Sequence, residues 1–157
     1  MYTSKRGFTL LEILLVVAAI AILAGIVIVA LNPSKQLGET RNAQRQSDVN
    51  AILNAVHQYT IDNNGVLPAA IDSVTGSAQV LGTAGAGLDS TCTATTTVAA
   101  GIDLESILVP TYIVDIPVDP TTGTAANTDY YISKTGAGRI VVGSCDAEES
   151  ASIEITR

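Results

Sequence analysis

The sequence predicts an α+β fold in which a long N-terminal helix packs on a small antiparallel sheet. Residues 8–31 form an apolar run that is interrupted by a single charge. Residues 35–62 carry apolar side chains at spacings of three and four, the period of an amphipathic helix. Near the C-terminus, short segments of alternating polarity are separated by glycine-containing turns, which is typical of strands. The chain has 157 residues and a formal net charge of -7, the size of one ordinary domain.

The apolar run is long enough to cross a membrane. As a helix, residues 8–31 would extend about 36 Å, whereas a hydrocarbon core is about 30 Å thick. A polar leader, residues 1–7, precedes the run, and its Lys5 and Arg6 favour a cytoplasmic N-terminus. We therefore expect a single-pass protein of the cytoplasmic membrane. A secretory signal cut near Ala30 and a plain uncleaved anchor are the two alternatives.

One carboxylate, Glu12, lies inside the apolar run. On insertion scales a buried acidic residue costs about 2.5–3.5 kcal/mol, and such residues usually have a functional partner. Because Glu12 lies near one end of the run, a side chain that reaches the lipid headgroups is the simpler explanation. Its sequence context is more specific: residues 5–12 read KRGFTLLE, so that basic residues, Gly7 and the aromatic Phe8 all precede Glu12.

This pattern resembles the prepilin signature of type IV pilins and of the related pseudopilins of type II secretion. The resemblance implies a pilin-like fold, and a prepilin peptidase that cuts between Gly7 and Phe8 and methylates the new N-terminus at Phe8. It also implies that the subunit is stored in membrane lipid and that an assembly platform in the membrane then draws it into a filament. That filament would contain identical subunits or other pilins and would reach the cell surface. In it, Glu12 would meet the Phe8 amine of a neighbouring subunit and set the register of assembly.

The stem, residues 32–62, follows a predicted interruption of the helix. Pro33 removes a backbone donor, and Asn32 is suited to cap a new helix with Pro33 in its first turn. With Gly25 as a second weak point, we expect the loosest part of the helix between residues 25 and 34. An apolar stripe should lie under the head, and it consists of Val49, Ile52, Leu53, Val56 and Tyr59. We expect the charges of the stem to be solvated, with salt bridges between subunits as the alternative; they are Lys35, Glu39, Arg41, Arg45 and Asp48.

The globular head, residues 63–157, should hold a three-stranded antiparallel sheet formed by residues 129–133, 139–144 and 151–156. Residues 71–100 are low in charge and rich in small residues, and we expect a flexible, variable loop there. Residues 116–120, IPVDP, resemble the proline-and-aspartate turn that precedes the sheet in many pseudopilins, although the Trp-Gly that often completes this motif is lacking.

The two cysteines, Cys92 and Cys145, both follow the membrane segment. On an oxidising exterior such a pair predicts a disulfide bond, and two free thiols are the alternative. A cluster of acidic residues, Asp146, Glu148 and Glu149, is a weak candidate for a calcium site. Because its spacing is irregular, a solvated acidic turn is the stronger interpretation, and we expect neither a metal nor another cofactor.

The composition argues against catalysis and against direct nucleic-acid binding. A single histidine and two cysteines exclude a His-cluster metal centre and a four-cysteine zinc site. The head carries three basic and eleven acidic residues, which repels polyanions. Because of the resemblance to the prepilin signature, we interpret the chain as a structural subunit of a type IV pilus or pilus-like filament. A type II secretion pseudopilin is the close alternative, and a membrane-anchored exported enzyme or sensor is the remote one.

Overall fold

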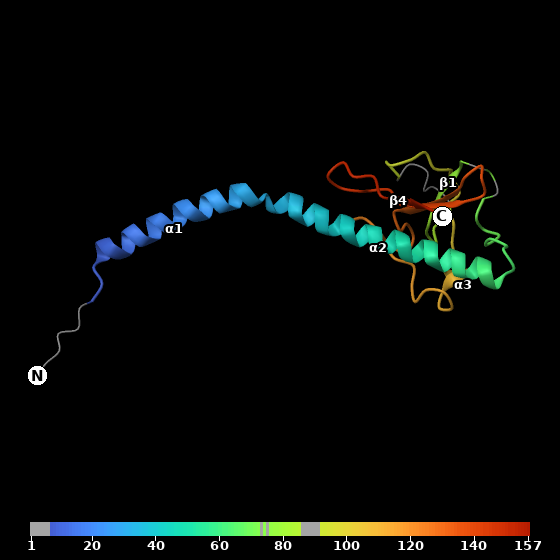
Figure 1. The fold of residues 1–157 in the computed structure, drawn as a ribbon, viewed down its shortest axis with the longest axis horizontal. Helices are drawn as coiled ribbons and strands as arrows, with labels where there is room; N and C mark the ends of the chain where they lie inside the picture. The colour runs from blue at the N-terminus through green and yellow to red at the C-terminus, as the bar shows by residue number, and fades with distance from the viewer. Residues whose placement is uncertain (1–6, 73, 75, 86–91) are drawn as a thin grey trace, which may run out of the picture. The chain divides into compact units, whose positions relative to one another are not determined.

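The first unit of the chain is dominated by one apolar helix. The computed structural model describes residues 7–72, 74, 76–85 and 92–157, which divide into the units Met1–Leu37 and Gly38–Arg157. Helix α1, Leu10–Leu31, is the blue helix of Figure 1. It has no buried residue. By length and composition it is able to cross a membrane.

Helix α1 begins two residues later than the sequence predicted. Thr9 has an extended backbone, and its side chain accepts a hydrogen bond of 3.2 Å from the backbone N–H of Glu12. This is the geometry of an N-cap, in which a threonine hydroxyl satisfies a free donor of the first turn. Phe8 therefore lies outside the helix, and the expectation that the helix starts there is wrong.

The helix is interrupted at Asn32, within the range where the sequence predicted weakness. Asn32 adopts a left-handed backbone (φ 40°, ψ 75°), whereas α1 runs unbroken through Gly25. The carbonyl oxygen of Asn32 then accepts hydrogen bonds from the backbone N–H groups of Lys35 and Gln36. A new helix, α2, extends over Pro33–Asp62, with proline at the position where its missing N–H is not needed.

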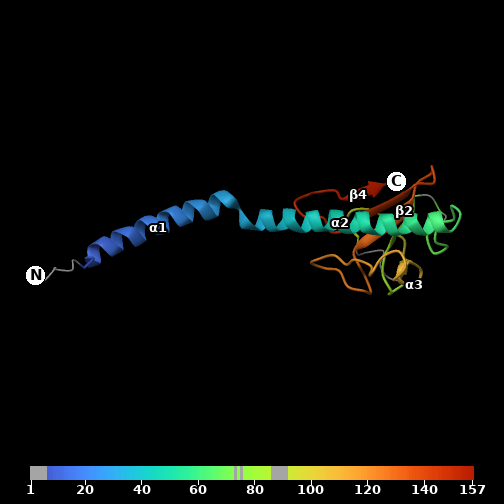
Figure 2. The same cartoon turned by 60° about the horizontal axis from the view of Figure 1, so that its bottom comes forward.

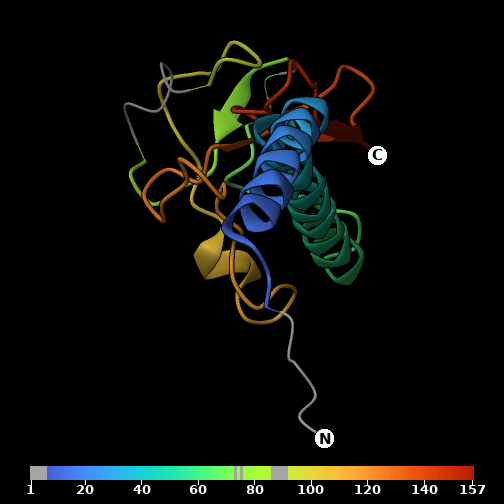
Figure 3. The ribbon, with the colours of Figure 1, turned by 90° about the vertical axis from the view of Figure 1, so that its left-hand side faces the viewer.

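The described residues of the head contain four strands, one more than predicted. They are β1 (Ala78–Val80), β2 (Tyr130–Lys134), β3 (Ile140–Ser144) and β4 (Glu154–Thr156), and they pair antiparallel in this order. A short helix, α3 (Glu105–Leu108), follows β1 in the chain. Seen along the view of Figure 3, β1 and α3 both lie on the same side of α2.

Strand β1 lies inside the stretch that we predicted to be a flexible loop. Val80 pairs with Tyr131 of β2, and both Ala78 and Val80 are buried. Leu81 and Ile102 form a further bridge beside the strand. The prediction failed because three residues are too few to show an alternating pattern, and only pairing with β2 identifies them as a strand. Residues 73, 75 and 86–91 of this stretch lie outside the described part of the chain.

The core lies between α2 and the sheet (Figure 2). The predicted stripe is confirmed, because Val49, Ile52, Leu53 and Val56 of α2 are each 0% exposed. They form one hydrophobic cluster with side chains of the sheet, which include Tyr130, Ile132, Ile140 and Val142. The aliphatic stripe thus holds the head on the second half of α2.

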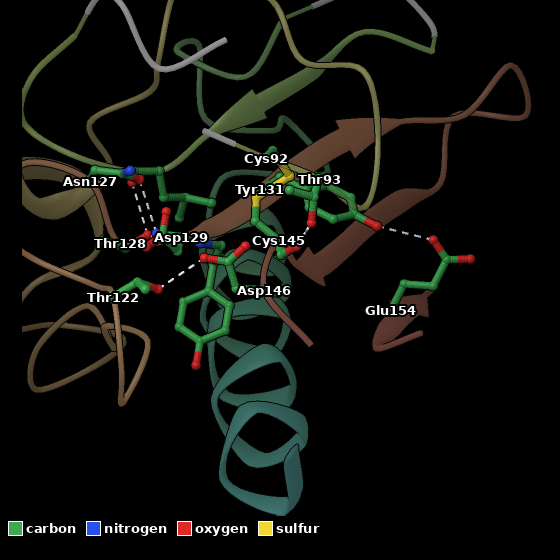
Figure 4. The surroundings of a disulfide bond; sticks show 12 residues. Cys92, Thr93, Thr122, Asn127, Thr128, Asp129, Tyr131, Cys145, Asp146 and Glu154 are labelled. Carbon is green, nitrogen blue, oxygen red and sulfur yellow. Dashed lines mark hydrogen bonds between the residues drawn. A yellow bond between two sulfur atoms is a disulfide. The ribbon is translucent and has the colours of Figure 1, made fainter. Parts of the chain in front are cut away.

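The disulfide bond between Cys92 and Cys145 is present, as the sequence predicted (Figure 4). It joins residues 53 positions apart, and Cys145 is almost completely buried beside Val80 and Tyr131. Thr93 adds a second connection, because its hydroxyl donates a hydrogen bond of 2.9 Å to the carbonyl oxygen of Cys145. The segment that begins at Cys92 is therefore fixed to the end of β3.

A buried ion pair fastens the loop before β2 to α2. Nε and Nη2 of Arg45 donate to the two carboxylate oxygens of Asp119, at 2.5 Å and 3.0 Å. Both side chains are 0% exposed. The prediction of a solvated charge is therefore wrong for Arg45, because the turn at residues 116–123 folds over it and supplies a carboxylate.

Other stem charges are also engaged by the head. Arg41 donates two hydrogen bonds of 2.7 Å to the carboxylate of Glu148, which also accepts a bond of 3.1 Å from Arg45. Asp48 accepts a hydrogen bond of 2.9 Å from the hydroxyl of Tyr130. The first half of α2 thus provides a second attachment surface for the head. It holds the head through charged and hydrogen-bonding side chains, whereas the second half holds it through aliphatic contacts.

Burial alone would raise the pKa of Asp119, but hydrogen bonds outweigh this effect. The guanidinium of Arg45, the hydroxyl of Thr121 and the backbone N–H groups of Thr121 and Thr122 all donate to this carboxylate. Together they lower its pKa to about 2. The fold therefore favours the ionised form of Asp119, and proton binding opposes folding.

We expect the disulfide bond to contribute strongly to the stability of the head. In the chain-entropy model, closing a loop of this length contributes about 4 kcal/mol. Replacing both cysteines (Cys92→Ala with Cys145→Ala) should lower the free energy of unfolding by about this amount, as measured by denaturant titration and near-UV circular dichroism of the full chain in detergent. Wild-type protein in reductant is the matched control and should show the same loss. A double variant as stable as the oxidised wild type would contradict this account.

The Arg45–Asp119 pair should make stability dependent on pH. Because the pKa of Asp119 is lowered, its contribution is complete above pH 3.8 and is lost as the pH falls towards about 2. Asp119→Asn should cost about 3–5 kcal/mol at neutral pH, since it leaves Arg45 buried without its charge partner. The variant should also lose less further stability on acidification than the wild type.

The measurement for this pair is thermal or denaturant unfolding at several values of pH between 2 and 7. Asp115→Asn is the matched control, because Asp115 is exposed and no hydrogen bond of the described residues uses its side chain. The control should follow the wild-type curve. Parallel curves for Asp119→Asn and the wild type would show that Asp119 does not carry this pH dependence.

Candidate functional site

The peptide bond between Gly7 and Phe8 is exposed and lies outside any helix. The described chain begins at Gly7, and Phe8 is 80% exposed. Apart from the chain neighbours of Gly7, no atom of the described residues lies within 4 Å of the place where its β-carbon would be. A peptidase needs an accessible peptide outside regular secondary structure, and this bond fulfils both conditions. Lys5 and Arg6, the predicted leader charges, lie outside the described residues.

Glu12 lies in the first turn of α1. Its backbone N–H is held by Thr9, so its carboxylate is close to the N-terminal end of the helix, where the helix dipole favours a negative charge. Among the described residues, its carboxylate has no ion-pair partner. The side chain is exposed on a helix that is otherwise apolar.

The surface of α1 is apolar all round. Every large apolar side chain on it is at least 48% exposed, a value that belongs to Val16. One face has a shallow groove lined by Ala21, Ile22, Gly25, Ile26, Val29 and Ala30. Small residues such as these allow another helix to approach closely. Gly25, which we predicted to be a weak point of the helix, lines this groove, and its lack of a side chain makes the groove deeper there.

The acidic cluster after β3 does not converge. Hydrogen bonds from Arg41 lower the pKa of Glu148 to about 2, so this carboxylate is already engaged by cations of the stem. Asp146 accepts a hydrogen bond of 3.0 Å from the hydroxyl of Thr122 (Figure 4). Glu149 instead lies beside Gly38, where an added β-carbon would be 3.2 Å from its Cγ. Within the described ranges, no group of three His, Cys, Asp or Glu residues is arranged to hold a metal ion.

Comparison with known proteins supports the N-terminal pattern. The family model described as the prokaryotic N-terminal methylation motif matches residues 2–28. Type II secretion system core protein G of Escherichia coli (strain K12) is 40% identical over 60 residues, which are 38% of this chain and 40% of that protein. The protein of the same name from Aeromonas hydrophila is 40% identical over 60 residues, which are 38% of this chain and 41% of that protein.

These similarities cover a limited part of each protein. The chain spans about two fifths of the length of the curated relatives that it matches. No solved structure matches the chain. The N-terminal motif, the pseudopilin relatives and the α+β layout of a long helix with a small antiparallel sheet agree with one another. The predicted resemblance to the type IV pilins and pseudopilins is confirmed.

Proposed function

We propose that the chain is a structural subunit, and not an enzyme, of a pilus-like filament that forms by packing of α1. The observation that carries this proposal is α1 itself, which has no buried residue and a single carboxylate. Burying a large aliphatic side chain is worth about 1.5–3 kcal/mol, so an apolar helix of this length cannot remain in water. Lipid covers it before assembly, and the helices of other subunits cover it afterwards.

The chain then acts in four parts. Residues 1–7 are a leader, residues 8–31 the membrane and assembly segment that contains α1, residues 32–62 the stem and residues 63–157 the head. A prepilin peptidase removes the leader on the cytoplasmic side and methylates Phe8. Both leader charges, Lys5 and Arg6, leave with the leader, while the apolar helix is retained. A membrane assembly platform moves the subunit from the cytoplasmic membrane into the filament, with the head outside.

Glu12 acts as the assembly residue in this mechanism. After cleavage the amine of Phe8 is an ammonium group that lies before the N-cap Thr9, outside the helix. Because Phe8 is not part of the helix, helical geometry does not hold its amine beside the Glu12 carboxylate of the same subunit. In an apolar surrounding, an unpaired carboxylate is costly and a paired one is sensitive to geometry. Pairing of Glu12 with the Phe8 ammonium of a neighbouring subunit would remove the cost of an unpaired carboxylate. Because the pair is sensitive to geometry, it would also fix the register between the two subunits.

A pseudopilin of a type II secretion system is the second candidate. The relatives named type II secretion system core protein G favour it. The turn at residues 116–120 agrees with it, whereas the disulfide bond between Cys92 and Cys145 leans towards a type IV pilin. Both candidates share the processing step and the assembly helix, so the experiments below test what they have in common.

Processing is tested by producing the chain together with a prepilin peptidase. Mass spectrometry and N-terminal sequencing should find N-methylated Phe8 as the first residue. Gly7→Leu should block the cut because the added side chain occupies the peptidase's position for glycine, while the open space around Gly7 leaves the fold unchanged. An intact leader in the wild type, or a cut near Ala30, would refute the proposal.

The assembly role of Glu12 is tested with Glu12→Leu. The variant should insert into the membrane and be processed normally, yet yield at least about tenfold fewer filaments, because loss of a desolvated charge pair removes more than 1.4 kcal/mol per contact. Filaments are counted by electron microscopy and by immunoblot of sheared material. Val16→Leu, an apolar change on the same helix, is the control and should assemble like the wild type. Normal incorporation of Glu12→Leu would exclude this role.

A further inference from the structure

The three cations of the head lie at one end of the sheet. They are Lys134, Arg139 and Arg157. Lys134 pairs with Ile140 across β2 and β3, and Ile140 exchanges two backbone hydrogen bonds of 2.9 Å and 3.0 Å with Arg157. Residues 134–139 form the turn between β2 and β3, which we call the basic hairpin. No hydrogen bond or ion pair of the described residues uses the side chain of Lys134 or Arg139.

A pocket with an acidic mouth lies at the other end of the same sheet. Its cavity has a volume of about 230 Å³. Six apolar side chains, which include Leu81, Ile102 and Leu104, line it together with the three acidic side chains of Asp103, Glu105 and Asp115. No lysine or arginine is among the described residues around it. We call it the acidic pocket.

Strand β2 separates the two features. The backbone N–H of Leu81 in the acidic pocket donates to the carbonyl of Tyr130, the first residue of β2, while Lys134 is the last. Four residue steps along a strand correspond to about 14 Å. The basic hairpin and the acidic pocket therefore lie at opposite ends of β2 in one head, too far apart to form ion pairs with each other there.

We propose that the basic hairpin of one copy docks in the acidic pocket of the next copy. This inference rests on the proposed filament function. A contact between two different surfaces of identical subunits is heterologous, and where its rotation does not close it generates an open helical polymer. Arg139 fits the pocket in two ways, because its aliphatic stem packs on the apolar floor while its guanidinium meets the carboxylates.

The pocket suits a side chain better than a metal ion. Its carboxylates are spread around an apolar floor, and the described residues contain no metal-binding group of three. The complementary charge lies on the same molecule, at the place where a head-to-tail arrangement of heads would present it. Because the charges are exposed, the contact selects register and neighbour more than it adds cohesion.

The test is a charge exchange in the full chain. Arg139→Glu and Asp115→Arg should each lower the yield of sheared filaments about three- to fivefold, the range of an exposed ion pair. The two changes combined should restore the yield, since they rebuild the pair with its charges reversed. Both side chains are exposed and unbonded among the described residues, so the head should fold, which near-UV circular dichroism checks. Glu105→Arg combined with Arg139→Glu provides a second pair.

The control is Asp62→Arg, the same change of charge at the exposed end of α2, which should assemble like the wild type. If wild-type filaments form and the single variants assemble equally well, the docking inference fails while the proposed function stands. It also fails if the combined variants are no better than the single ones, or if only Asp115→Arg is defective, which would mean that the pocket holds another partner. Absence of filaments from the wild type would overturn both.

Discussion

The apolar surface of α1 is the constraint on which the rest of the molecule depends. A helix of 22 residues with no buried side chain has only two stable surroundings, a lipid bilayer and a bundle of similar helices. Apolar contact is not directional, so it provides cohesion without fixing how far one helix slides along another. In the proposed filament, Glu12 would add the register that the aliphatic side chains lack, since a buried charge is stable only where it meets a partner.

The head uses the same two kinds of interaction in a different proportion. Aliphatic residues of α2 hold the sheet, and the buried pair of Arg45 and Asp119 fixes the turn before it. This turn is tight: a β-carbon on Gly123 would lie 2.2 Å from the backbone nitrogen of Asp119. The glycine therefore allows the chain to fold back over the carboxylate of Asp119. This carboxylate then accepts hydrogen bonds from Thr121 and Thr122 of the turn and from Arg45 of α2.

The sequence predicted those features that have a local signal. The apolar run, the stripe from Val49 to Tyr59 and the paired cysteines each follow from periodicity, length or residue type. The partner of Arg45 has no such signal, because Asp119 is 74 residues away and nothing near Arg45 distinguishes it from the solvated charges beside it. Strand β1 was missed for a related reason, since its identity depends on its pairing with β2, about fifty residues later. What escaped prediction was thus decided by contacts between distant segments.

These long-range contacts also determine where charge is available for a neighbour. Arg41 and Arg45 form ion pairs with Glu148 and Asp119, so these two cations of the stem are already paired within the subunit. The cations that remain at the sheet end are carried by the turn between β2 and β3 and by the C-terminal strand, which place them away from the carboxylates of the acidic pocket. The charges of the stem are thus paired within the subunit, whereas the head carries positive charge at one end of the sheet and negative charge at the other. Such a head has two different ends, so a neighbouring copy could bind it in one orientation. Directional charges on the heads and a non-directional apolar helix are complementary requirements for a polymer, because the helices keep the subunits together while the charges determine how each one is placed.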